Sequence, residues 1–186
     1  MQIYLLSIIL FFSFSIIFSY KKLYLFSLIS MIAMTTYTLI FLNIGDISHS
    51  YRSDYITRFI GWSMSTPLLL LMLISSCKIK PSNHQIISII MLDILMIYSG
   101  YYTLIDNENK WIYFSLSSYF FLFLIFSIYQ LKPKNLLFIY LFMIWSVYPI
   151  IFALYQSNII NRYYYDISIL ISDFISKLGF GCLFLV

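Results

Sequence analysis

The chain has 186 residues, of which 62% are hydrophobic and 10% are charged, and its formal net charge is +4. A soluble globular domain carries about 25% charged residues, so the composition excludes one and indicates a protein whose apolar surface is solvated by lipid. The net charge is too small to indicate nucleic-acid binding, and we interpret it as a signal of membrane topology. Aromatic residues make up 21% of the chain. Interfacial belts need fewer, so many aromatic side chains are expected to pack between helices or around a ligand.

Polar breaks divide the sequence into seven apolar stretches of about 20 residues, each long enough to cross a bilayer as a helix. The helices are expected at Ile3–Tyr20, Leu23–Asn43, Tyr55–Cys77, Gln85–Ile105, Trp111–Leu131, Asn135–Gln156 and Tyr164–Val186. No linker is long enough to separate domains, so residues 1–186 are expected to form one all-α membrane domain. The first stretch lacks a basic n-region and a small-residue cleavage site, and we expect it to stay as a membrane helix.

The loops between these stretches differ in charge. Three alternate loops carry a surplus of lysine, at Lys21, Lys22, Lys78, Lys80, Lys132 and Lys134. The other three loops carry most of the acidic residues. Positively charged loops face the cytoplasm, so the N-terminus is expected outside and the C-terminus in the cytoplasm of a multi-pass cell-membrane protein.

A lysine lies inside the last apolar stretch, four residues after an aspartate. At this spacing Lys177 and Asp173 share one face of a helix. A charged group at membrane depth is costly and commonly has a partner and a function. From these residues alone two interpretations stay open: a structural ion pair, and a reactive lysine that condenses with an aldehyde. Cys77 and Cys182 give neither a metal-binding spacing nor a disulfide framework. No nucleophile–base pair indicates an enzyme, and we expect no catalytic residue and no metal site.

Two further runs carry polar and aromatic residues at helical spacing. The run Arg58-Phe59-Ile60-Gly61-Trp62-Ser63-Met64-Ser65-Thr66-Pro67-Leu68 places Arg58, Gly61, Trp62, Ser65 and Thr66 on one helix face. The second run is Trp145-Ser146-Val147-Tyr148-Pro149. With Asp173-x-x-x-Lys177-x-Gly-Phe-Gly, these runs resemble three motifs of the microbial (type I) rhodopsins, in order: Arg-Tyr-x-x-Trp-x-x-x-Thr-Pro-Leu, Trp-x-x-Tyr-Pro and Asp-x-x-x-Lys-x-Gly-Phe-Gly. The resemblance covers essentially the whole chain.

The resemblance implies a seven-helix bundle that holds all-trans retinal covalently on Lys177 as a protonated Schiff base. It implies that Asp173 is the carboxylate counterion and that Trp62 and Trp145 enclose the polyene. These residue types suit the task, because an anion helps a nearby cation to keep its proton and aromatic rings give flat apolar walls. The other implied pocket residues are Tyr148, Thr66, Ser65, Leu69, Met96, Ser99, Gly100, Phe114, Ser117, Ser118 and Phe152. For the small residues of this set, plain helix packing is the alternative.

The ion pathway that the resemblance implies departs from that of outward proton pumps. It comprises Arg58, Gly61, Ser65, Met72, Asp93 and Asp54. Outward pumps have a carboxylate at the position of Gly61, which accepts the Schiff-base proton, and another at the position of Met72, which returns it. Neither glycine nor methionine can relay a proton in a membrane. An ordinary outward proton pump is therefore disfavoured.

Two aspartates of this pathway also have structural interpretations. Asp93 is expected to hydrogen-bond Thr66, and a proton-relay role is the alternative. Asp54 lies one turn before Arg58 and is expected to form a surface salt bridge that contributes little stability. A role for Asp54 in the extracellular proton path is the alternative.

Three functions fit the pattern, and we rank inward proton transport first. The schizorhodopsins are similar in having no carboxylate at the position of Gly61, a serine at that of Ser65 and the aspartate at that of Asp173 as sole counterion. They commonly carry Phe and Glu at the positions of Gly61 and Met72.

The second function is chloride transport. Loss of a carboxylate at Gly61 is expected to leave space beside the Schiff base, where Arg58 and Ser65 are available to bind an anion. Halide pumps commonly have a hydroxyl or amide at that position, however. The third function is a sensory photoreceptor without net transport, which needs a separate transducer. Many relatives form trimers or pentamers, so we expect a homo-oligomer in membrane lipid.

Overall fold

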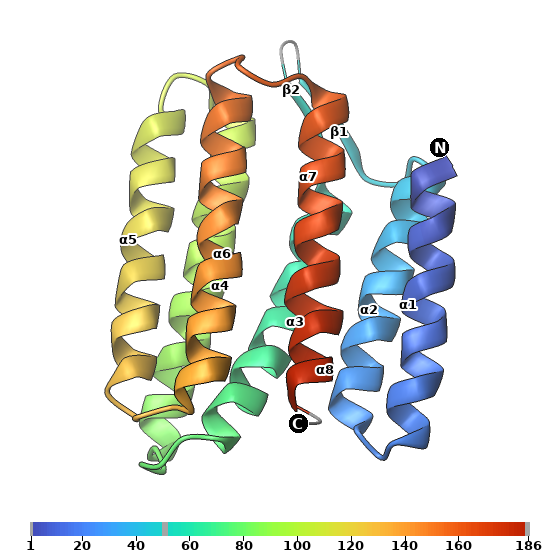
Figure 1. Cartoon of the computed structure of the whole chain (residues 1–186). Helices are drawn as coiled ribbons and strands as arrows, with labels where there is room; N and C mark the ends of the chain where they lie inside the picture. The colour runs from blue at the N-terminus through green and yellow to red at the C-terminus, as the bar shows by residue number, and fades with distance from the viewer. Residues whose placement is uncertain (1, 50–51, 185–186) are drawn as a thin grey trace.

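The computed structural model describes residues 2–49 and 52–184, and in this part of the chain seven spans are long and apolar enough to cross a membrane (Figure 1). Six of them are α1 Gln2–Tyr20, α2 Tyr24–Phe41, α3 Ile56–Ser75, α4 Asn83–Ile105, α5 Lys110–Tyr129 and α6 Asn135–Gln156. The seventh span consists of α7 Arg162–Phe174, the π-turn η1 Ile175–Gly179 and α8 Phe180–Phe184. The predicted all-α, seven-helix fold is confirmed. The predicted end of the last helix, Val186, lies outside the described residues.

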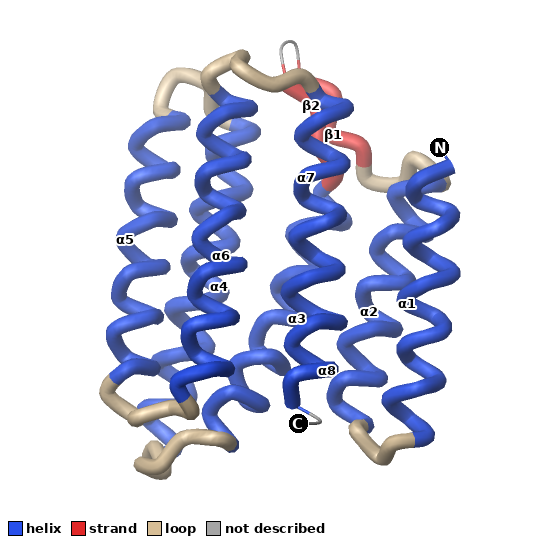
Figure 2. Tube along the Cα trace, in the orientation of Figure 1, coloured by secondary structure: helices blue, strands red, loops and turns tan. Residues whose placement is uncertain are grey.

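A β-hairpin between α2 and α3 was not predicted from the sequence. Its strands, β1 Asp46–His49 and β2 Arg52–Tyr55, are antiparallel, and Asp46 pairs with Tyr55. Gly45 enters the hairpin with φ +80°, a conformation that side chains rarely adopt. The hairpin lies at the same end of the bundle as the N-terminus (Figure 2), and we call this the hairpin end. The end of α8 lies at the opposite side.

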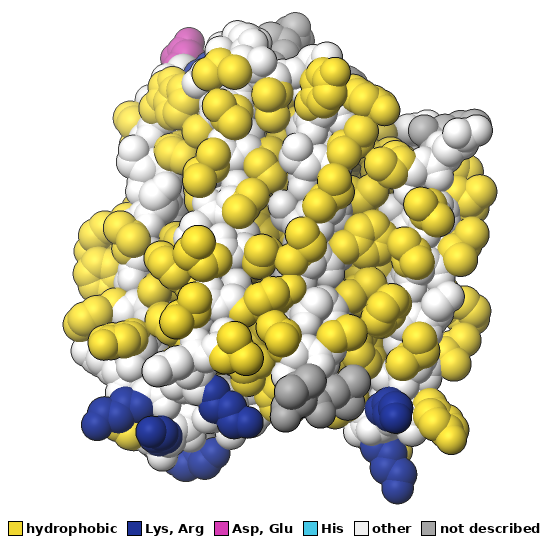
Figure 3. Space-filling model, viewed as in Figure 1, with side chains coloured by type: hydrophobic (Ala, Val, Ile, Leu, Met, Phe, Trp, Pro, Cys, Tyr) yellow, Lys and Arg dark blue, Asp and Glu magenta, His cyan; other side chains and the backbone are white. Residues whose placement is uncertain are grey.

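The outer surface between the two ends is apolar. Figure 3 shows hydrophobic side chains over most of this face and Lys and Arg side chains gathered at the end opposite the hairpin, the lysine end. Inside the bundle, polar contacts join neighbouring helices. Ser15 of α1 and Ser27 of α2 are 3.2 Å apart at their hydroxyl oxygens, a common way to join membrane helices. The interior combines a core of large apolar side chains with buried polar groups that are hydrogen-bonded inside the bundle.

Helix starts and bends follow from local residues. The Ser82 hydroxyl accepts a hydrogen bond from the backbone N–H of Gln85, and the Gln85 side-chain oxygen accepts one from the backbone N–H of Ser82; this capping box begins α4. The Asn161 side chain caps α7 by accepting from the N–H of Tyr164. Pro67 and Pro149 lie inside α3 and α6, where each removes a backbone donor. Pro149 borders the pocket described next.

Candidate functional site

A buried ion pair forms the polar side of the site. Lys177 lies in the π-turn, and its Nζ is 2.5 Å from Oδ1 of Asp173, the two side chains being 3% exposed. Two such charges are costly to remove from water, and each offsets the cost of the other only when their hydrogen bonds are satisfied. The predicted sharing of one face is therefore observed, although the backbone between the two residues passes from an α-helix into a π-turn.

Asp173 accepts hydrogen bonds from three aromatic side chains besides Lys177. Tyr37 of α2 donates to Oδ2 at 2.7 Å and Tyr148 of α6 donates to Oδ1 at 2.7 Å. The indole Nε1 of Trp62 is 3.1 Å from Oδ1. Lys177, Tyr148 and Trp62 thus donate to Oδ1 and Tyr37 donates to Oδ2, and hydrogen bonds to an ionised carboxylate favour its charged form.

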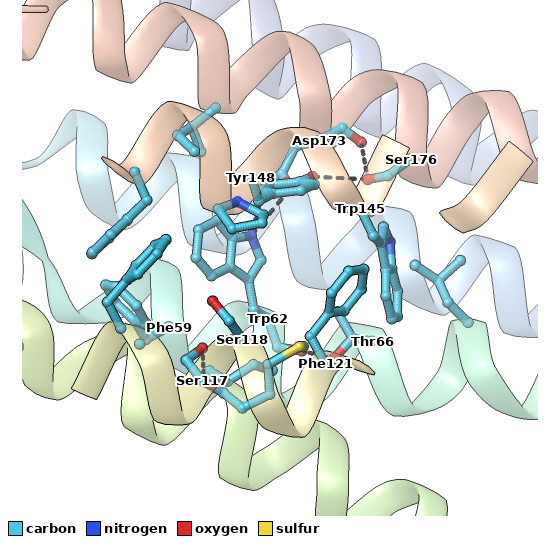
Figure 4. A pocket seen from close by; sticks show the side chains of 18 of the residues that line it. Phe59, Trp62, Thr66, Ser117, Ser118, Phe121, Trp145, Tyr148, Asp173 and Ser176 are labelled. Carbon is cyan, nitrogen blue, oxygen red and sulfur yellow. Dashed lines mark hydrogen bonds between the residues drawn. The ribbon is translucent and has the colours of Figure 1, made fainter. Parts of the chain in front are cut away.

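An aromatic pocket opens beside this ion pair (Figure 4). Trp62 stands edge-on to Tyr148, with ring centroids 5.5 Å apart and planes at 85°. Trp145, whose side chain is 5% exposed, also lines the pocket. Asp173 and Ser176 lie together on one side of the pocket, and Ser117 and Ser118 lie across it, as Figure 4 shows. The pocket is thus a mostly apolar space with an amine and a carboxylate at one part of its wall.

Most residues that the sequence assigned to a pocket line this one. They are Lys177, Asp173, Trp62, Trp145, Tyr148, Thr66, Leu69, Met96, Gly100, Phe114, Ser117, Ser118 and Phe152. Ser65 and Ser99 are not among the lining residues. Both are buried and turn their hydroxyls back to their own helix, to the carbonyls of Gly61 and Leu95. The role of these two serines in binding retinal stays a prediction, and plain helix packing is the other interpretation, because a serine in a membrane helix can satisfy its own hydroxyl in this way.

Sequence reasoning missed six lining residues: Phe59, Ile97, Phe121, Pro149, Ile169 and Ser176. Three of them had a signal. Phe59 lies one turn before Trp62, Pro149 follows Tyr148, and Ser176 precedes Lys177. The Ser176 hydroxyl is 3.0 Å from that of Tyr148. The three others are ordinary apolar residues of apolar helices, whose identity carries no signal.

The predicted hydrogen bond between Asp93 and Thr66 is confirmed, at 2.6 Å. It joins α3 to α4, and Asp93 is fully buried. Its other oxygen, Oδ1, has no hydrogen-bond partner within the described part of the chain. Met72, farther along α3 toward the lysine end, packs against the apolar core.

The space expected beside Gly61 is filled, which corrects the sequence interpretation. A Cβ atom placed on Gly61 would overlap Oγ1 of Thr36 in α2 and would lie 3.0 Å from its Cγ2. The missing side chain is thus used for close approach of α2 to α3. The sequence interpretation considered only α3 and therefore could not foresee a side chain arriving from α2.

The expected surface salt bridge of Asp54 is also wrong in one respect: the pair is buried. Arg58 Nη1 is 2.5 Å from Asp54 Oδ1, both side chains being 0% exposed, and Arg58 Nη2 is 2.7 Å from Asp166 Oδ1. Asp54 also accepts from the Tyr165 hydroxyl at 2.7 Å and from the Tyr55 N–H at 2.7 Å. Burial raises the pKa of Asp54 above its ordinary value, although Arg58 and these donors act to lower it. The β-hairpin buries the pair, since Asp54 belongs to β2.

A second ion pair ties the hairpin to α7 at the surface. Arg162 Nη2 is 3.2 Å from Asp46 Oδ1, with both side chains 34% exposed. Within residues 2–49 and 52–184, no group of three or more His, Cys, Asp or Glu side chains is placed to hold a metal ion.

Comparison with known proteins agrees with this geometry. The sequence matches the family described as bacteriorhodopsin-like protein over residues 2–186. No curated protein sequence matches the chain.

Three solved structures illustrate the similarity in fold. The proton-pumping rhodopsin AR2 of the marine alga Acetabularia acetabulum is 26% identical, with a TM-score of 0.83 over 99% of this chain and 88% of that one. The light-driven proton pump of Coccomyxa subellipsoidea is 24% identical, with a TM-score of 0.88 over 97% and 93%. Schizorhodopsin 4 is 23% identical, with a TM-score of 0.79 over 97% and 91%. Family match, seven membrane spans and a lysine inside an aromatic pocket agree: the chain belongs to the bacteriorhodopsin-like family of microbial rhodopsins, multi-pass membrane proteins that bind retinal on a lysine.

Proposed function

We propose that the protein binds all-trans retinal covalently on Lys177 and uses light to move protons inward across the cell membrane. The observation that carries this proposal is the buried Asp173–Lys177 pair at the wall of an aromatic pocket, with Gly61 where a second carboxylate would stand in an outward pump.

The residues present fit retinal. A primary amine lies in a mostly apolar pocket, where an aldehyde can condense with it. Trp62 and Trp145 offer flat walls to a conjugated chain. Bound retinal would supply light absorption and a change of shape on illumination. Asp173 would act as the anion that favours a proton on the nitrogen of Lys177.

We infer the direction of transport from the groups near Lys177 that could accept a proton. Asp173 accepts from Lys177, Tyr37, Tyr148 and Trp62, and these donors favour its anionic form over its protonated form. Gly61 has no side chain to accept a proton. We propose that a proton released from the site leaves toward the lysine end, and the positive charge of that end supports a cytoplasmic location for it.

The return of a proton would come from the hairpin end. Asp54, Arg58 and the partly buried Asp166 form a charged group at that end, and the raised pKa of Asp54 means that it takes up a proton more readily than an exposed aspartate does. We therefore give Asp54 the role that the sequence left as an alternative, in the extracellular proton path.

Two observations favour protons over chloride as the transported ion. The Acetabularia acetabulum relative is a proton-pumping rhodopsin. The place beside Gly61, where chloride was expected to sit, is occupied by Thr36.

Light-induced pH change in a suspension of cells that make the protein with added retinal tests the function. Inward proton transport predicts that the medium becomes alkaline in light and that a protonophore abolishes the change. Alkalinisation that a protonophore enhances would instead mean inward anion movement. The Lys177→Ala variant is the control and is expected to give no signal. Absence of any signal from a coloured wild-type protein would contradict transport and favour a sensor.

A further inference from the structure

The contact between Thr36 and Gly61 lies one residue before two side chains that hold the counterion. Tyr37 follows Thr36 in α2, and Trp62 follows Gly61 in α3, and both neighbours donate hydrogen bonds to the same carboxylate, Asp173. Thr36 is 8% exposed, and its hydroxyl donates to the carbonyl of Ile32 at 2.9 Å. Its side chain is thereby held in one orientation, with Oγ1 and Cγ2 toward Gly61.

We propose that Thr36 is a positioning residue that fills the niche left by Gly61 and so excludes a second anion from the neighbourhood of Asp173. Thr36 then determines ion specificity: it keeps a single fixed negative charge beside Lys177 and denies chloride a binding place. This inference deepens the proposed function and rests on it, because an effect of anions on the site is read through retinal held on Lys177.

Two donor groups of α3, one turn before and one turn after Gly61, explain why the filling of the niche matters. The Nε of Arg58 is buried and has no hydrogen-bond partner in the described residues, and Ser65 is fully buried with its hydroxyl on the Gly61 carbonyl. An N–H donor of a guanidinium and a hydroxyl are groups that bind anions. A site on α3 with such donors and no carboxylate at residue 61 would attract chloride if it had room. The two γ atoms of Thr36 take that room.

Truncation of Thr36 tests the proposal. Thr36→Ala removes both γ atoms, whereas Thr36→Val keeps two γ atoms of similar size and removes only the hydroxyl. The visible absorption band of each purified pigment is recorded during a titration with sodium chloride and, separately, with sodium gluconate at equal ionic strength. The band of Thr36→Ala is expected to shift with chloride and not with gluconate. The bands of wild type and Thr36→Val are expected to stay constant in both salts.

Two results would overturn the proposal: a wild-type band that already responds to chloride, or a Thr36→Ala band that does not. A response of Thr36→Val equal to that of Thr36→Ala would also overturn it, since the hydroxyl and not the volume would then be decisive. Failure of the proposed function is distinguishable, because wild type would then form no pigment or would give no protonophore-sensitive alkalinisation.

A second pair of variants keeps the test decisive if Thr36→Ala does not form pigment. Gly61→Ala places a Cβ on Thr36 Oγ1 and is expected to shorten the thermal half-life of the pigment. In the double variant Gly61→Ala with Thr36→Gly, the methyl group of residue 61 in α3 fills the niche in place of the Thr36 side chain from α2. This variant should regain the thermal half-life of wild type, and its band should not respond to chloride. A Gly61→Ala pigment as heat-stable as wild type would show that the niche is open and would overturn the proposal.

Discussion

At the scale of single residues, the site is defined by what surrounds one carboxylate. Asp173 receives donors from four elements of the bundle: Tyr37 in α2, Trp62 in α3, Tyr148 in α6 and Lys177 in the π-turn. Asp173 therefore connects α2, α3 and α6 to the last span, and it also balances the charge of Lys177. The sequence indicated the pairing with Lys177 through spacing alone, whereas the partner Tyr37 is 136 residues away and had no local signal.

Lys177→Ala is expected to abolish the visible band that forms when all-trans retinal is added, since an alanine has no amine for the aldehyde. Absorption spectroscopy of the purified protein measures this. Lys134→Ala, which removes an exposed lysine next to α6, is the matched control and should keep the band. Unchanged colour in Lys177→Ala would contradict the assignment of the retinal to this residue.

Asp173→Asn is expected to move the absorption band to the ultraviolet at neutral pH. An opposite charge within about 4–6 Å stabilises a protonated nitrogen, and the asparagine variant lacks it. A spectrum taken across a pH titration should regain the visible band on acidification. Asp93→Asn, which changes a buried carboxylate bound to Thr66, serves as a comparison and should stay visible at neutral pH. A persistent visible band in Asp173→Asn would mean that another anion balances the charge.

At the scale of elements, the π-turn places Lys177 and also has its own support. The Tyr140 hydroxyl of α6 donates to the carbonyl of Ile175, the first residue of η1, at 2.6 Å. Gly179 makes room for that hydroxyl, since a Cβ there would overlap it and would lie 3.1 Å from Cζ of Tyr140. π-turns occur mostly as single turns within α-helices and frequently at functional sites. In this protein, the Tyr140 hydroxyl bonds to the first carbonyl of the π-turn, and Gly179 leaves the space that this hydroxyl needs.

Gly179→Ala is expected to displace the Tyr140 hydroxyl, to break its bond to Ile175 and to shift the absorption maximum while lowering thermal stability. A hydrogen bond of this kind contributes about 0.5–1.5 kcal/mol. Tyr140→Phe loses the bond without steric overlap. The double variant should be more stable than Gly179→Ala alone, because the overlapping oxygen is gone. Thermal bleaching is measured for wild type, Gly179→Ala, Tyr140→Phe and the double variant. If the losses of stability of the two single variants simply add up in the double variant, the contact between Tyr140 and Gly179 is contradicted.

The elements also show why prediction from sequence succeeded in some places and failed in others. Length and apolarity indicate a membrane span without knowledge of its neighbours, so the seven spans were predictable. The strand residues Asp46, Ser48, Arg52 and Asp54 are polar and give no strand pattern. The hairpin is held by contacts to α3 and α7, which a local pattern cannot contain. For the same reason the niche of Gly61 could not be read from α3, since Thr36 fills it from α2.

At the scale of the whole molecule, the two ends of the bundle differ. The hairpin end is closed by a buried charge group around Arg58, and the lysine end carries solvated lysines (Figure 3). The hairpin takes part in a buried ion pair, Asp54–Arg58, and in a partly exposed one, Asp46–Arg162. The two pairs allow the effect of burial on stability to be compared.

Asp54→Asn is expected to destabilise the pigment by about 1.5–3 kcal/mol, since a buried hydrogen bond to a charged group is lost and Arg58 keeps only Asp166. Asp46→Asn, the matched control, breaks an exposed pair of a kind that contributes about 0–1 kcal/mol. Thermal bleaching rates at fixed pH compare the two. Equal losses would contradict a special role for burial at the hairpin end.

The spacing of charges in the two buried ion pairs also bears on how the chain enters the bilayer. Arg58 has Asp54 four residues before it, and Lys177 has Asp173 four residues before it. Each cation is therefore preceded by its own counterion at four residues' distance, which is made first as the chain is synthesised. A single charged residue at the centre of an inserting helix costs about 2.5–3.5 kcal/mol on translocon scales. A segment that is already neutral at its cation can leave the translocon early: that of Arg58 before Asp166 has been synthesised, and that of Lys177 before Tyr37, Trp62 and Tyr148 have packed against Asp173.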